Sequence, residues 1–181
     1  MTAATVGLLV IDNVLSDPQG YRDLALTREF RTYEFPHCKF HGIAVVNALP
    51  GELYEQLPAK PDLAFFRKSP AGQVEPHFIH TDVDMGDWSA LLYLNPNPPK
   101  GDGTDFWKHS ETGEVSNKIP HLRSVEGRDK SNWTLRHHVE SKFNRLVLFG
   151  SDYYHSRAIF DNWGEGNDAR LVQVVFGKGA L

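Results

Sequence analysis

The sequence predicts a mainly β protein with N-terminal helices, built as a barrel or a double-sheet jelly roll. Short runs of β-branched, aromatic and leucine residues fill the second half of the chain, and clusters of Pro, Gly, Asn and Asp separate them. Helix signals occur only before residue 62. Many short strands without long helices between them favour a closed or two-layered antiparallel sheet.

Composition is that of a folded globular protein of one domain. The chain has 181 residues, of which 40% are hydrophobic and 23% charged, which excludes disordered, collagen-like and coiled-coil classes. A net charge of −4 gives no overall attraction to nucleic acid or to anionic membranes. Cys38 is the single cysteine, so no intrachain disulfide is expected, and no apolar run suits a signal peptide or membrane span. The expected location is cytoplasmic, with neither membrane nor nucleic acid as partner.

Residues 1–62 are expected to form a helical N-terminal support. Val6–Val10 is typical of a short buried strand, and a helix is expected to begin near Ser16, which forms a capping box with Gln19. A second, short helix is expected from Gly51 to Leu57. The face of the first helix that should pack on a sheet is formed by Tyr21, Leu24 and Ala25.

Residues 63–181 are expected to form the jelly-roll core. A long polar stretch, residues 108–142, carries charges of both signs and is expected to be a surface excursion rather than a further layer. The expected strands are Phe78–Val83, Ser89–Leu94, Thr104–Trp107, Arg145–Phe149, His155–Phe160 and Arg170–Phe176.

A candidate metal site begins with His80 and Asp82. Residues two apart in a strand point to the same face, so both side chains could reach one ion. The same spacing recurs in His109-x-Glu111 and His138-x-Glu140, but these lie in the polar excursion and are expected to be solvated surface residues. The first pair instead precedes the apolar run Trp88–Leu94, which can hold it rigidly.

His155 is the best placed third ligand, because it follows the apolar run Leu146–Phe149 and a turn. Its alternative role is that of a hydrogen-bonded core or surface histidine. Two histidines and one carboxylate on one face of an octahedral ion leave neighbouring positions open, as in non-haem ferrous oxygenases. A structural zinc site is disfavoured, because such sites are closed and usually rich in thiolates.

The order of these features carries a resemblance over residues His77–Phe176 and, more loosely, Val10–Ser16. The matching motifs are His80-Thr81-Asp82, Ala90–Asn95, Gly101–Phe106, Asn144–Phe149, His155-Ser156 and Arg170–Phe176. In this order the chain resembles the 2-oxoglutarate- and iron-dependent oxygenases, particularly their prolyl 4-hydroxylase-like branch. The resemblance implies a double-stranded β-helix, the jelly-roll form of that family, as a single oxygenase domain.

It also implies Fe(II) held by His80, Asp82 and His155, with 2-oxoglutarate and dioxygen as co-substrates. The implied reaction hydroxylates a small-molecule or peptidyl substrate, not identified by the sequence, and releases succinate and CO2. Arg170 is the implied anchor for the distal carboxylate of 2-oxoglutarate, because a guanidinium can hold a carboxylate through two hydrogen bonds. The segment between His155 and Arg170 is longer than usual in the family. Arg157 is a rival anchor, because it lies two residues after His155 and would share its face in a regular strand.

Several assignments have alternatives. Arg170 could instead pair with a nearby carboxylate: Asp161, Glu165 or Asp168. Tyr93 could donate a hydrogen bond to the co-substrate and Trp107 could wall the site, or both could be core aromatics. His77 is expected to be structural. For the whole chain, the alternatives are a metal-dependent jelly-roll dioxygenase that does not use 2-oxoglutarate and a non-catalytic jelly-roll module that binds sugars or peptides.

Overall fold

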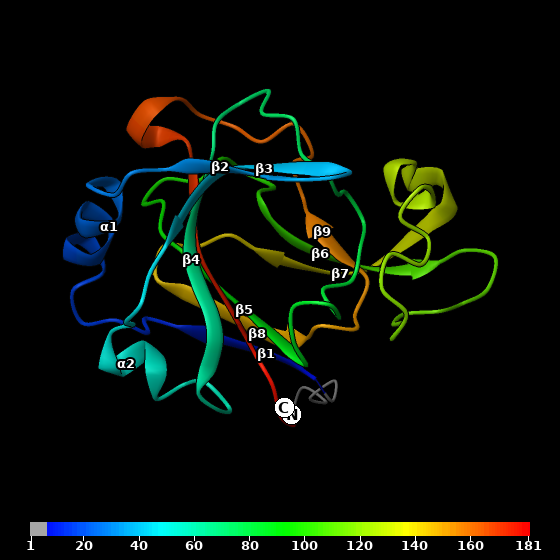
Figure 1. Cartoon of the computed structure of the whole chain (residues 1–181), viewed down its shortest axis with the longest axis horizontal. Coiled ribbons are helices and arrows are strands. Elements are labelled where there is room, and N and C mark those ends of the chain that lie inside the picture. Colours follow the sequence, from blue (N-terminus) through cyan, green and yellow to red (C-terminus); the bar gives the residue numbers. More distant parts are fainter. Residues whose placement is uncertain (1–6) are drawn as a thin grey trace.

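The computed structural model describes residues 7–181, and Figure 1 shows its strands arranged as two facing layers. Val6, the first residue of the expected N-terminal strand, lies outside the described residues. The strands are β1 (Leu8–Asp12), β2 (Arg31–Phe35), β3 (Cys38–Val45), β4 (Pro61–Ser69), β5 (Trp88–Tyr93), β6 (Gly103–His109), β7 (Trp133–Glu140), β8 (Arg145–Gly150), β9 (His155–Arg157) and β10 (Arg170–Gly177). The α-helices are α1 (Pro18–Leu26) and α2 (Gly51–Tyr54), and short 3-10 turns cover Glu126–Arg128, Lys130–Asn132 and Gly166–Asp168.

In residues 7–181 the strands form a seven-stranded sheet, in the order β1-β8-β5-β10-β4-β3-β2, and a three-stranded sheet, in the order β7-β6-β9. Neighbouring strands pair antiparallel. The expected mainly β jelly roll is therefore confirmed.

The larger sheet is buried on both faces. Along β10, Leu171 and Val175 belong to an apolar cluster with residues of α1 and α2, whereas Val172 and Val174 belong to a cluster shared with β6 and β7. This alternation follows from the two-residue period of a strand. One core thus lies between the sheet and the helices, and the other lies between the two sheets.

The expectation of a helical support over residues 1–62 is wrong in part, because this segment also supplies strands at both edges of the larger sheet. β1 pairs with β8 at one edge, and the β2–β3 hairpin forms the other. β2 gave no burial signal, since all of its residues are exposed. A hairpin with little buried surface has no continuous apolar run to mark it.

Helix α1 begins later than expected. Its N-cap is Asp17, whose carboxylate accepts a hydrogen bond of 2.9 Å from the amide of Gly20, so the expected capping box at Ser16 is absent. Ala25 is fully buried and Tyr21 packs against the core, as expected, but Leu24 is 46% exposed and faces solvent. The helical segment after Pro50 ends at Tyr54 rather than at Leu57.

Residues 108–142 are not a pure surface excursion, since Trp133–Glu140 form β7, which pairs with β6. Of the eight residues of β7, Trp133 and Val139 are buried and the others are exposed. Most residues of this edge strand are therefore exposed, which explains why its sequence resembles that of a polar loop. No helix within residues 7–181 has the length and apolar character needed to cross a bilayer.

Candidate metal centre

His80 and His155 face each other across an isolated antiparallel bridge. The amide of His80 donates to the carbonyl of His155 at 3.0 Å, and the amide of His155 donates to the carbonyl of His80 at 2.9 Å. The expected strand Phe78–Val83 is otherwise irregular chain, and the expected strand after His155 ends at Arg157. The two backbone hydrogen bonds of this bridge, rather than a regular strand, thus fix the spacing of the two imidazoles.

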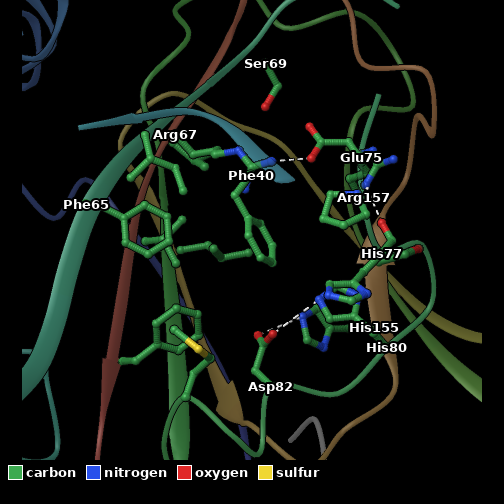
Figure 2. A pocket seen from close by; sticks show the side chains of 18 of the residues that line it. Phe40, Phe65, Arg67, Ser69, Glu75, His77, His80, Asp82, His155 and Arg157 are labelled. Carbon is green, nitrogen blue, oxygen red and sulfur yellow. Dashed lines mark hydrogen bonds and ion pairs between the residues drawn. The ribbon is translucent and has the colours of Figure 1, made fainter. Parts of the chain in front are cut away.

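Asp82 completes the group. Its amide donates to the carbonyl of Ser151 at 2.7 Å, and its carboxylate accepts a hydrogen bond from Ser89 at 3.3 Å. The Oδ1 atom lies 3.2 Å from Nε2 of His80, and Oδ2 lies 3.1 Å from Nε2 of His155 (Figure 2). The potential ligand atoms of the three residues lie within 4.8 Å of one another. The structure therefore brings together the three side chains that the sequence singled out.

The hydrogen bonds of the rings fix which nitrogen faces the carboxylate. Nδ1 of His80 lies 2.8 Å from the carbonyl of Phe78, and Nδ1 of His155 lies 2.9 Å from the carbonyl of Tyr153. A carbonyl oxygen only accepts, so Nδ1 of each ring carries a proton. Nε2 can then donate to Asp82 when it is protonated, or present its lone pair to a bound metal when the ring is neutral. Lone pairs and carboxylate oxygens then converge, which a cation between them would stabilise. The donor set fits a divalent metal with open coordination positions.

The interactions among the three side chains also favour a negatively charged Asp82. Burial alone would raise the pKa of Asp82, but the adjoining imidazoles hold it well below its usual range. Burial likewise opposes protonation of His80, yet the charge and hydrogen bond of Asp82 raise its pKa above the ordinary value. This is the behaviour of a carboxylate that keeps its negative charge inside the protein.

The histidines of residues 108–142 lie elsewhere. His138 is on the exposed face of β7, 2.6 Å from a carboxylate oxygen of Asp105. His109 was expected to be solvated, but it is 2% exposed, and its Nε2 lies 2.5 Å from a carboxylate oxygen of Glu126. The reason is that residues 108–132 fold back over β6 and cover the ring. Neither histidine competes for the candidate metal site.

A cavity of about 350 Å³ opens from the metal group and lies between the sheets. Arg170 lines it from the first position of β10, and its side chain is 8% exposed. Its Nε lies 3.5 Å from Oδ1 of Asp102, and its terminal nitrogens donate no hydrogen bond to any described residue. The expected alternative pairing with the carboxylates of residues 161, 165 or 168 is not found. Arg170 therefore lines the cavity without a hydrogen bond from its guanidinium to any described residue.

Arg157 is held differently. Its Nε donates to the carbonyl of Phe160 at 2.8 Å and its Nη1 donates to the carbonyl of His77 at 3.0 Å. Its guanidinium also lies 5.1 Å from the ring centre of Phe78. Burial lowers the pKa of Arg157 to about 10, and the charge of Arg170 adds to this. Because the guanidinium of Arg157 already contacts two backbone carbonyls and an aromatic ring, Arg157 is the poorer candidate anchor.

Arg67 and Glu75 also line the cavity, and the sequence did not single them out. The guanidinium of Arg67, on β4, pairs with the carboxylate of Glu75 (Figure 2). The other oxygen of Glu75 accepts from Gln73 at 3.0 Å and from Asn162 at 3.1 Å. No local motif marks this network, because its members come from a strand and from two separate loops.

Tyr93 and Trp107 are core aromatics. The hydroxyl of Tyr93 lies 2.6 Å from that of Thr104, and its side chain is fully buried between the sheets. Trp107 donates to the hydroxyl of Ser156 at 2.9 Å and belongs to a separate aromatic cluster. His77 does line the cavity, with its ring centre 5.5 Å from that of His80.

No protein-family model and no curated protein matches this sequence. Solved structures do match the fold. HygX from Streptomyces hygroscopicus, crystallised with nickel, 2-oxoglutarate and hygromycin B, has a TM-score of 0.55 at 14% identity over 94% of this chain and 82% of HygX. The chain has the fold of the 2-oxoglutarate-dependent oxygenases.

Two further structures support that likeness. SnoK, a non-haem α-ketoglutarate-dependent carbocyclase from nogalamycin biosynthesis, matches with a TM-score of 0.55 at 13% identity, over 94% of this chain and 78% of SnoK. A prolyl-4-hydroxylase from Pseudomonas putida matches with a TM-score of 0.50 at 18% identity, over 96% and 94% of the two chains. The likeness to this oxygenase fold therefore spans nearly all of the chain.

Proposed function

We propose that the chain is a single-domain Fe(II)- and 2-oxoglutarate-dependent dioxygenase that hydroxylates a small-molecule substrate and releases succinate and CO2. One observation carries the proposal: the group His80, Asp82 and His155 shares a cavity with the unpaired guanidinium end of Arg170. Structures with the same fold contain iron, nickel and 2-oxoglutarate, which supports the same cofactors here.

In this proposal His80, Asp82 and His155 hold the iron through Nε2 and carboxylate atoms. When bound, ferrous iron supplies the redox chemistry that couples the reduction of dioxygen to decarboxylation of the keto acid and oxidation of the substrate. The protein keeps Nε2 of each ring available, because the backbone carbonyls accept the Nδ1 protons. Ser89 holds the carboxylate in place.

Arg170 is proposed to bind the distal carboxylate of 2-oxoglutarate. Its stem is fixed by β10, and Asp102 behind it stabilises the charge without occupying the terminal nitrogens. A buried guanidinium without an anion at its open end is costly, so a carboxylate in the cavity would stabilise it. Arg67 is unsuited to this role, because Glu75 already neutralises it.

Anaerobic spectroscopy tests the function. Protein with ferrous iron and 2-oxoglutarate should show a visible metal-to-ligand charge-transfer band, and in air it should form succinate slowly without added substrate. His155→Ala should abolish both signals, whereas His138→Ala, which alters an exposed histidine of β7, should leave both unchanged. Iron binding without either signal would favour a dioxygenase that does not use 2-oxoglutarate. Failure to bind any divalent metal would favour a non-catalytic binding module.

A further inference from the structure

The cavity has polar groups at two ends and apolar walls between them. The metal group forms one end, and the arginine network forms the other (Figure 2). The apolar walls come mainly from the larger sheet, including its β2–β3 hairpin. They include Phe35, Phe40, Phe65, Leu91, Val174 and Phe176. The space that a second ligand would fill is therefore bounded largely by hydrocarbon.

The β2–β3 hairpin contributes aromatic rings to this space. Phe40 lies 5.8 Å from Phe35 in an edge-to-face arrangement and 5.7 Å from the ring of His77, measured between ring centres. The guanidinium of Arg67 lies 5.7 Å from the same Phe40 ring. Phe35 is 56% exposed although it lines the cavity, so part of its ring is open to contact with a ligand. Rings in such positions favour another ring through offset or edge-to-face contact.

The charges around the cavity leave little to bind an ionic substrate. Among the described lining residues, Arg67 pairs with Glu75, Arg157 donates to backbone carbonyls, and Arg170 lies near Asp102, which is buried behind the cavity wall. The remaining positive charge of this end is matched by one carboxylate at Arg170.

At the mouth, Nε2 of His121 lies 3.6 Å from a carboxylate oxygen of Asp84, both side chains reach solvent, and Met85 and Leu122 line the same opening. A polycation, a sugar or a zwitterion entering here would lose water without finding enough partners to replace it. An uncharged ring system would displace water that binds only weakly to the apolar walls, and it would give up few hydrogen bonds of its own.

We propose that the substrate is an uncharged, predominantly hydrocarbon small molecule with a ring system. Its rings would lie against Phe35 and Phe40 on one side and against Leu91 and Val174 of the larger sheet on the other. This identification rests on the proposed function only in naming the ligand a substrate. The ligand class itself is inferred from the cavity walls. It is not taken from the hygromycin B that is bound in the HygX structure.

Fluorescence titration with N-phenyl-1-naphthylamine, an uncharged aromatic probe that brightens on leaving water, tests the ligand class on the full chain without added metal. We expect saturable binding at one site. Phe35→Ser should weaken it about fivefold or more, and Leu91→Asn about tenfold, because each removes apolar contact. Leu135→Ser, which changes a half-exposed leucine of β7 outside the cavity, should bind the probe like the wild type.

Phe35 is largely exposed, so its variant should keep the thermal midpoint and far-ultraviolet spectrum of the wild type even if Leu91→Asn is unstable. Unsaturable probe binding, or equal affinity in a folded Phe35→Ser variant and the wild type, would overturn the proposal. So would displacement of the probe by hygromycin B or by N-acetylproline amide at equal concentration. Probe binding as expected, in a protein that shows neither the charge-transfer band nor succinate, would support the ligand class while refuting the oxygenase. The band and succinate without probe binding would do the reverse.

Discussion

Replacing Arg170 by Lys should weaken the binding of 2-oxoglutarate without changing the binding of iron. Lysine keeps the positive charge but replaces a rigid fork by a single ammonium group. The guanidinium of Arg170 makes no hydrogen bond to any described residue, and its Nε lies 3.5 Å from Asp102, so at least one charge-assisted bond to the ligand would be lost. Such a bond contributes about 1.5–3 kcal/mol. This corresponds to a loss of affinity of roughly 10- to 150-fold.

Arg157→Lys is the matched control. Its guanidinium donates to the carbonyls of Phe160 and His77, so its replacement should lower stability modestly and leave 2-oxoglutarate affinity within about twofold. Anaerobic titration of 2-oxoglutarate into each iron-loaded variant, followed by the charge-transfer band, gives both affinities. If Arg170→Lys binds like the wild type and Arg157→Lys binds weakly, the anchor is Arg157 and the assignment is wrong.

Three further outcomes are expected. Asp82→Ala should weaken ferrous iron binding by at least about 100-fold, measured by competition with a chelator, because it removes the one anionic ligand; unchanged affinity would exclude this metal centre. Asp12→Asn should lower the free energy of unfolding by about 1 kcal/mol at pH 7. Hydrogen bonds from Arg145 and Lys142 depress the pKa of Asp12 in the folded state, so this stabilisation is complete above the ordinary carboxyl range. Urea titrations should show the deficit shrinking as the pH falls below that range, and a deficit independent of pH would contradict the ion pairing. Tyr21→Phe should cost about 1 kcal/mol in the same assay, since it breaks a 2.7 Å bond to Gln173, and a neutral effect would mean that water replaces it.

The apolar strands could be predicted from the sequence because nearly all of their residues are hydrophobic. The runs Ser89–Leu94, Arg145–Phe149 and Arg170–Phe176 are hydrophobic on both faces, as expected for strands covered on two sides. β3 and β4 escaped prediction, although Ala64, Phe65 and Phe66 of β4 are buried. β2 and β7 escaped it because they are edge strands with few buried residues. Periodicity detects burial, and these strands are held chiefly by pairing with a neighbour.

The metal group could be predicted for a related reason, although its stated geometry was wrong. In the sequence, His80 precedes the apolar run of β5 and His155 follows that of β8, which limits where their backbones can lie. The expected regular strand around His80 is replaced by a single bridge, a difference that side-chain spacing does not encode. Arg67 and Glu75 could not be foreseen, since their pairing depends on how β4 and a loop meet in three dimensions.

The reciprocal hydrogen bonds between the backbones of His80 and His155 position two of the candidate metal ligands without a metal ion. The conformational entropy of both ligands is lost when the polypeptide folds, so binding an ion need not order them. A zinc finger, by contrast, acquires its structure from the metal. Here the metal-free chain should retain its sheet topology, and one divalent ion should exchange for another without a refolding step. The ion that occupies the centre is then decided by cellular supply and by the nitrogen and oxygen donors, and not by which ion the chain can fold around.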